Sequence, residues 1–172
     1  MLFNRIKKIK ESANAAEASI LANGWAEFKD STYTSGSPLQ LAADTDTVIN
    51  NDGTLGTKTY APTGVTLFDN NKITGREGEG ILITLEFSAK PTNSNTTYLD
   101  VWLDIGGSIG EIYRHTHSFP KGLNQPKLIS ETIFGYTLNT WETNGASVYM
   151  NAINTCDIYD IRCIVGRVYP IT

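Results

Sequence analysis

Two hydrophobic patterns divide the chain near residue 24. In the first 23 residues, apolar side chains recur every three or four positions, as on one face of an amphipathic helix; they are Leu2, Ile6, Ile9, Ala13, Ala16 and Ile20. Asn23-Gly24 is a typical helix end. From Trp25 onward the apolar residues alternate with polar ones or form short runs. The pattern predicts an N-terminal helix over residues 1–23 and a β domain over residues 24–172.

The β domain is predicted to consist of short strands separated by Gly, Asn, Asp and Pro turn signals. In Ile81–Phe87 the odd-numbered residues are apolar and share one face, while Thr84 and Glu86 lie on the other. One apolar face per strand, with no helix between strands, predicts an all-β antiparallel sandwich or jelly roll. The predicted strands are Trp25–Phe28, Leu39–Leu41, Thr47–Asn50, Val65–Phe68, Ile81–Ala89, Tyr98–Ile105, Gly110–Tyr113, Leu128–Leu138, Ser147–Asn154 and Ile158–Tyr169.

Two local features sharpen this prediction. Asn144-Gly145 lies between the apolar stretches Tyr136–Trp141 and Val148–Met150, which favours a tight hairpin. In the last strand, alternation places Tyr159 on the apolar face together with Ile161, Cys163 and Val165. Both features fit an antiparallel sheet that is covered on one side.

Composition and charge argue against several classes of function. The chain has 172 residues, enough for one domain with a short appendage, and only 19% of them are charged. Its formal net charge is −4, which argues against nucleic acid as a partner. Four of its 14 basic residues lie within the first ten positions. No apolar run reaches the roughly 18 residues of a membrane helix, and charges interrupt the start, so neither membrane insertion nor a secretory signal is expected.

The residues that could bind a metal or act in catalysis are better explained by structural roles. Cys156 and Cys163 are expected to be reduced, buried thiols. His115 and His117 would point to one side of a strand, which a metal could use, but no ligand follows at a standard spacing, so they are interpreted as polar rim or loop residues. Glu77 and Glu79 in a glycine-rich loop are expected to be solvated, without the raised pKa of a catalytic acid.

The acidic segments Asp44–Asp46 and Asn50–Gly53 contain oxygen ligands of the kind that calcium prefers, but they do not match an EF-hand because Val48 falls at a ligand position. They are interpreted as ordinary turns, and a loop-built calcium site stays open as an alternative. No catalytic residue, cofactor or metal site is therefore predicted.

The segment Trp25–Thr34, followed by Ser37–Leu41, resembles the opening of small bacteriophage virion proteins of the capsid decoration or head-fibre type. Those proteins have a jelly roll like that of tumour necrosis factor and complement C1q. The likeness continues through Thr47–Gly53 and Val65–Asp69 to the closing strand Ile158–Val168, so it covers the chain from Trp25 to the end. The resemblance implies a TNF/C1q-like jelly roll that forms a homotrimer through the outside of its barrel.

The resemblance also gives a meaning to two aromatic residues that alternation places opposite the apolar stripe of their strand. Tyr98 and Trp102 share a face with Asp100 and Asp104. Aromatic side chains on an outer face are favoured anchors in protein interfaces. Tyr98 and Trp102 are therefore expected at the trimer interface.

Three functions are consistent with these patterns to different degrees. The favoured one is a structural, non-enzymatic virion protein at the capsid surface (decoration, cement or head fibre), whose partner is the major capsid protein or a tail or fibre adaptor. Its basic helix would be the capsid anchor, through Arg5, Ile6, Lys7, Lys8, Ile9 and Lys10. The alternative is a receptor- or carbohydrate-binding head of a tail fibre that binds a host glycan through Trp141, Tyr149 and Asn144. A polysaccharide-degrading enzyme is least favoured because the chain lacks a convincing acid/base pair.

Overall fold

The computed structural model describes Lys8 and residues 24–53, 66–120 and 125–169. The helix predicted over residues 1–23, with its proposed anchor residues, lies outside this part of the chain except for Lys8, which is exposed. The described elements are β1 (Gly24–Lys29), β2 (Leu39–Leu41), β3 (Thr47–Ile49), β4 (Phe68–Asp69), β5 (Lys72–Ile73), β6 (Gly80–Pro91), β7 (Tyr98–Asp104), β8 (Glu111–Ser118), β9 (Lys127–Tyr136), α2 (Asn139–Asn144), β10 (Ser147–Ala152) and β11 (Cys156–Tyr169).

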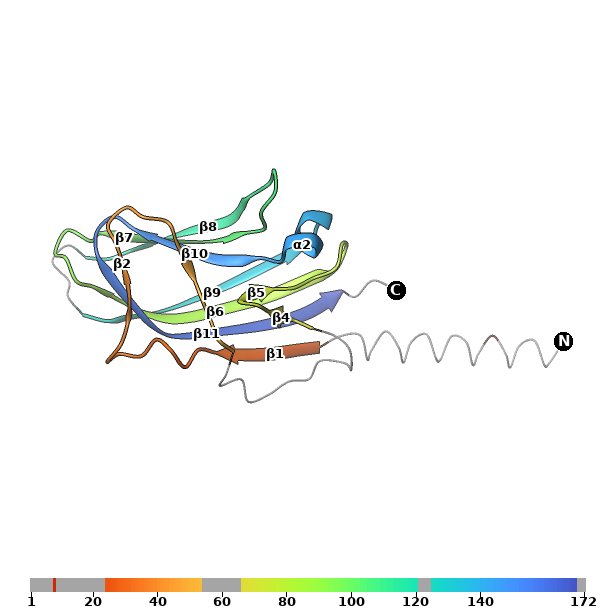
Figure 1. Cartoon of the computed structure of the whole chain (residues 1–172), viewed down its shortest axis with the longest axis horizontal. Helices are drawn as coiled ribbons and strands as arrows, with labels where there is room; N and C mark the ends of the chain where they lie inside the picture. Colours follow the sequence, from red (N-terminus) through yellow and green to blue (C-terminus); the bar gives the residue numbers. More distant parts are fainter. Residues whose placement is uncertain (1–7, 9–23, 54–65, 121–124, 170–172) are drawn as a thin grey trace.

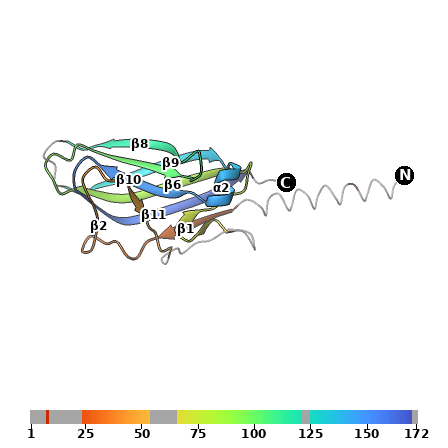
Figure 2. The same cartoon turned by 45° about the horizontal axis from the view of Figure 1, so that its top comes forward.

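Most of the strands form two facing antiparallel sheets, as Figures 1 and 2 show, and β4 pairs with β5 in a separate two-stranded sheet. The first sheet has the order β1-β11-β6-β9, and β2 pairs with the start of β11. The second sheet has the order β3-β10-β7-β8. Neighbouring strands are distant in sequence in several of these pairs, as in a jelly roll. The predicted all-β sandwich is confirmed.

The core lies between the sheets and is built from the apolar faces that alternation predicted. On β6 the side chains of Ile81, Ile83, Leu85 and Phe87 are at most 3% exposed. On and just after β7 the same holds for the alternate residues from Leu99 to Ile105. Because burial of apolar area is the dominant stabilising term in folding, this period-two pattern fixes which face of each strand turns inward.

A bulge in β11 contradicts one predicted face. The register between β11 and β6 shifts between Tyr159 and Arg162, and Asp160 has a φ of +54°. The extra residue places both Ile158 and Ile161 in the core cluster, while Tyr159 lies outside it. The prediction that Tyr159 shares a face with Ile161 is therefore wrong, because strict alternation fails at a bulge.

The predicted hairpin at Asn144-Gly145 is also wrong. The structure has a short helix there, α2, which ends at Gly145 with φ +70°. Trp141 from α2 is 1% exposed, and its Nε1–H donates a hydrogen bond to the Ile73 carbonyl at 2.9 Å. A Cβ on Gly145 would lie 2.9 Å from the Lys72 Cβ, so glycine is required both by the backbone angle and by the close approach of β5.

Some strand bounds differ from the prediction, and the cysteines agree with it. β8 is longer than predicted and β5 was missed. Of the predicted strand Val65–Phe68, Val65 lies outside the described residues, and of the rest only Phe68 belongs to a strand, the short β4. Cys156 and Cys163 are free and buried as expected, and burial raises the pKa of each thiol to about 12. In the described ranges no helix has the length and apolar character needed to cross a membrane.

Candidate assembly surface

The outward face of the first sheet carries most of the exposed large apolar side chains. We call this set the exposed apolar face, and it comprises Trp25 on β1, Leu82 on β6, Phe134 and Tyr136 on β9, and Val168 on β11. Phe134 and Tyr136 are 59% and 66% exposed. Contiguous apolar patches of this kind on a soluble domain mark interaction sites.

The strand register explains why these residues meet. Trp25 is paired with Gly166, Gly166 with Leu82, and Leu82 with Phe134, so one rung of the sheet crosses β1, β11, β6 and β9. Their neighbours along each strand point into the core, as Ala26 and Ile83 do. The exposed apolar face is therefore a consequence of the same alternation that builds the core, with hydrophobic residues in positions where a sheet facing water has polar ones.

A shallow groove of about 390 Å³ lies over the part of this rung that β1, β11 and β6 form, and Gly166 is among its lining residues. A Cβ built on Gly166 would come no closer than 3.8 Å to any neighbouring atom within the chain, the nearest being in Leu82 and Trp25. The isolated fold thus has room for a side chain at residue 166. The walls of the groove include Ile164 and Val168, so its lining is largely apolar.

An ionic row crosses the middle of the same sheet face. Arg162 donates a 2.6 Å hydrogen bond from Nε to Glu27 and another of 2.6 Å from Nη1 to Glu86. These bonds raise the pKa of Arg162, with the bond to Glu27 as the largest cause. Because one guanidinium serves two carboxylates, this row keeps a local charge of −1 beside the exposed apolar face.

The aromatic residues proposed for the trimer interface have different surroundings. Trp102 lies outside the core cluster, as predicted, but it is only 3% exposed. The Arg114 guanidinium carbon covers its ring at 3.9 Å, and Tyr149 stacks on it with centroids 5.6 Å apart. Trp102 is therefore already covered within its own chain and does not present a ring to a partner. Tyr98 is half-buried, and its role at an interface stays a prediction.

Two ion pairs hold the Arg114 side chain over the Trp102 ring. Arg114 pairs with Glu111 at 2.5 Å and with Asp100 at 3.0 Å. The bond with Glu111 is the largest cause that raises the pKa of Arg114, and the same bond lowers the pKa of Glu111. A bulge makes this possible, because two residues of β8, Tyr113 and Arg114, stand opposite Trp102 alone.

The proposed glycan-binding residues do not form one exposed site. Trp141 is buried and hydrogen-bonded inside the fold, so the prediction that it offers a face to a sugar is wrong. The Asn144 side chain donates to the Ile105 carbonyl at 3.1 Å, which anchors α2 to the end of β7. Tyr149 is half-buried against Trp102 on the outer face of the second sheet.

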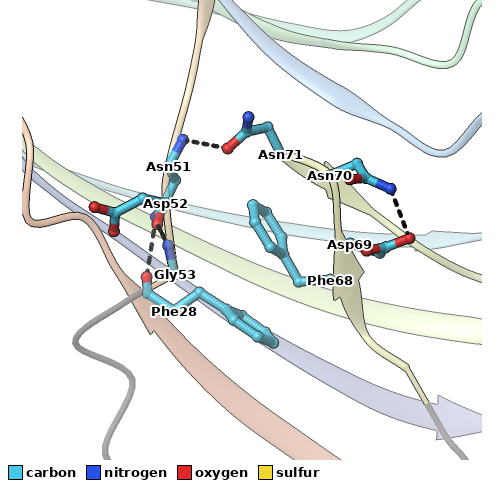
Figure 3. A pocket seen from close by; sticks show the side chains of 8 residues that line it. All are labelled: Phe28, Asn51, Asp52, Gly53, Phe68, Asp69, Asn70 and Asn71. Atoms are coloured by element: carbon cyan, nitrogen blue, oxygen red, sulfur yellow. Dashed lines mark hydrogen bonds between the residues drawn. The ribbon is translucent and has the colours of Figure 1, made fainter.

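A different hollow, of about 470 Å³, combines aromatic and amide groups and is shown in Figure 3. Phe28 and Phe68 stack with ring centroids 4.8 Å apart. The hollow is also lined by a set of turn residues with amide and carboxylate groups: Asn51, Asp52, Asp69, Asn70 and Asn71. Asn51 is buried. Its side-chain amide donates a hydrogen bond to the Phe28 carbonyl and accepts one from the Gly53 amide, so Asn51 forms part of the wall of the hollow.

The acidic turns serve structural roles. The Asp52 carboxylate accepts hydrogen bonds from Ser31, and Asp46 accepts one of 2.7 Å from Asn151. The prediction of a solvated turn is wrong for Glu79, which is 2% exposed and pairs with Arg167 at 3.2 Å. Within the residues described, no group of three or more His, Cys, Asp or Glu side chains is arranged to hold a metal ion.

The comparisons with known proteins find likeness in structure only. No family model and no curated protein sequence matches the chain. The solved structure of PRD1 vertex protein P5 is similar with a TM-score of 0.50 and 17% identity, over 86% of this chain and 97% of that one. Eiger TNF from S. frugiperda matches with a TM-score of 0.52 and 8% identity, over 88% of this chain and 96% of that one.

The globular domain of zebrafish complement 1qA gives a TM-score of 0.45 at 8% identity, over 86% of this chain and 98% of that one. At these identities the two higher-scoring likenesses establish the fold and nothing more. The chain has a TNF-like jelly-roll fold.

Proposed function

We propose that this chain is a non-enzymatic, structural virion protein of a bacteriophage that assembles as a homotrimer and decorates or stabilises the capsid surface. One observation carries the assembly part of the proposal: no described part of the chain covers the exposed apolar face or the groove over Gly166. Apolar area of this kind favours association because its burial removes it from water. A second copy of the chain is the occupant that this jelly-roll resemblance implies.

The virion part rests on the sequence resemblance and on the charge distribution. The resemblance to capsid decoration and head-fibre proteins covers the chain from Trp25 onward. The similar PRD1 protein is, by its name, a vertex protein. We extend such a particle location to this chain as part of the proposal. The basic segment Arg5–Lys10 would bind acidic patches of the major capsid protein or of a tail or fibre adaptor, leaving the acidic jelly roll outside.

Gly166→Lys tests the assembly. In the single chain the new side chain has room and can keep its ammonium group in water. In a trimer that covers the groove, the same ammonium group would be removed from water, and the nearby carboxylates of Glu27 and Glu86 are already bound by Arg162, so its burial costs several kcal/mol. Gly36→Lys is the matched control, because it adds the same charge at an exposed turn.

We expect Gly166→Lys to be a folded monomer and Gly36→Lys to remain a trimer in sedimentation velocity. A trimeric Gly166→Lys protein would reject this face as the interface. Removal of residues 1–23 separates assembly from attachment: the shortened chain should remain a trimer and lose binding to purified capsids. Unchanged binding would count against the anchor.

The hollow beside Phe28 and Phe68 favours a second candidate function, a carbohydrate-binding head. Sugars bind on aromatic rings next to amide and carboxylate groups, and this hollow contains both. Asn70→Gly removes one lining amide from an exposed turn, and glycine accepts the φ of +49° there, whereas Asn95→Gly removes an exposed amide outside the hollow. Glycan-array binding that is lost with Asn70→Gly and kept with Asn95→Gly would favour a receptor-binding head over decoration; an array without binding would favour decoration.

A further inference from the structure

Two strand edges of the sandwich face each other across a cluster of titratable side chains. β8 is the last strand of the second sheet, and β9 is the last strand of the first. Figure 2 shows the two strands along the same side of the molecule. His115 and His117 from β8 both reach Glu131 of β9: His115 Nδ1 lies 2.6 Å from Oε2, and His117 Nε2 lies 2.7 Å from Oε1.

These three residues occupy inward-facing positions. His115 is paired with Val101 and His117 with Leu99, and both partners belong to the core. Glu131 lies on β9 between two core residues, Ile129 and Ile133. Apolar side chains at these positions would have closed the sandwich edge. Three ionisable groups stand there instead, which makes closure of this edge depend on their protonation.

The cluster has one carboxylate for two imidazoles. With both imidazoles neutral, its charge is −1, and a first proton neutralises it. A second proton has no further carboxylate to pair with, because Asp100, the other nearby acid, is bound by Arg114 at 3.0 Å and by Thr116 at 2.6 Å.

The surroundings disfavour a proton on His117 in particular. Its side chain is 16% exposed, and its Nε2, although close to Glu131, has no hydrogen-bond partner among the described residues. Burial is the largest cause that lowers the pKa of His117; Lys127 and His115 lower it further, while Glu131 and Asp100 act in the opposite direction. Lys127 stays close because its ammonium donates to the Ser118 carbonyl at 3.2 Å.

We propose that His115, His117 and Glu131 form an acid-sensitive latch between β8 and β9, and that protonation of His117 opens this edge of the sandwich. An opened edge exposes His117 to water, where its pKa returns to about 6.5. Because the closed form binds this proton less readily than the open form, the latch is stable at neutral pH and weakens as the pH falls below about 6.5. This inference goes beyond the proposed function and does not depend on it.

Hydrogen exchange of the full chain between pH 7.5 and 5 tests the latch. After correction for intrinsic exchange rates, the amides of β8 should lose protection on acidification relative to those of β6, with a slope of at most about tenfold per pH unit because one proton is taken up. His117→Gln cannot titrate and should abolish this slope. His115→Gln is the matched control at the more exposed ring and should keep it.

An NMR titration of the imidazole protons gives a second, independent readout. It should place the pKa of His117 below 6.5 in the native protein, and lower still in Glu131→Gln, which loses the attracting carboxylate. A native pKa at or above 6.5, or an unchanged slope in His117→Gln, would overturn the latch. So would Zn²⁺ that protects β8 in the wild type but not in His115→Gln, because the cluster would then be a metal site.

Discussion

Phe134→Ala should weaken the trimer much more than it destabilises the single chain. Phe134 lies on the exposed apolar face, paired with Leu82 on the next strand, and is 59% exposed. In an isolated chain the truncation removes only a cross-strand contact, which is worth about 0.2–1 kcal/mol. In the proposed trimer it also removes apolar area that the partner covers.

The size of the second effect follows from the exposure. An aromatic side chain has roughly 200 Å² to bury, so about 120 Å² of Phe134 is left in water by the fold. Covering that area completely is worth about 3 kcal/mol per protomer at about 25 cal/mol per Å². Three copies give about 9 kcal/mol, which raises the concentration of half-dissociation by about three orders of magnitude; coverage of half the area gives between one and two.

Sedimentation velocity over a dilution series measures this concentration, and urea unfolding measures the stability of the chain. Ile109→Ala is the control, because Ile109 is 43% exposed and lies in the connection between β7 and β8, away from the exposed apolar face. We expect Ile109→Ala to dissociate at the wild-type concentration. If Phe134→Ala does the same while folding normally, the assignment of this face to the trimer is refuted.

Three further predictions concern the fold. Trp141→Ala should lower the free energy of unfolding by about 3–5 kcal/mol in urea titrations, because it empties a core site and removes the bond to the Ile73 carbonyl; a loss below about 1 kcal/mol would contradict the buried position. Gly145→Ala should cost at least about 1–3 kcal/mol by the same measurement, since it combines φ +70° with a 2.9 Å approach to Lys72; a neutral effect would reject the turn geometry. Burial raises the pKa of Cys163 to about 12, so its thiol should resist a thiol reagent at pH 8 until the protein unfolds, and fast reaction in the native state would disprove this burial.

The sequence predicted the parts of the fold that depend on regular alternation. Ile81–Phe87 is predictable as a core strand because every second residue is apolar. The all-β class follows from the same pattern in the other strands. The error at Tyr159 arose where a single extra residue at Asp160 inverts the faces. No local signal in the sequence marks that bulge.

The candidate surfaces were less predictable because they depend on pairing between distant strands. Alternation placed Trp102 on an outer face correctly, but its cover by Arg114 requires the register of β7 with β8. The i, i+2 spacing of the two histidines shows them as a pair, whereas Glu131 lies on a different sheet and no spacing rule connects it to them. The exposed apolar face could have been found from the even-numbered residues Leu82 and Phe134, had the register of β6 with β9 been known.

The mass of the full chain in solution tests the central claim most directly. Light scattering coupled to size-exclusion chromatography at micromolar concentration should give about 57 kDa, three times the 18.9 kDa of one chain. Gly166→Lys should reduce that mass to a single chain. A wild-type protein that elutes at 18.9 kDa at every concentration tested would contradict the account, because its exposed apolar face would then have no second copy to cover it.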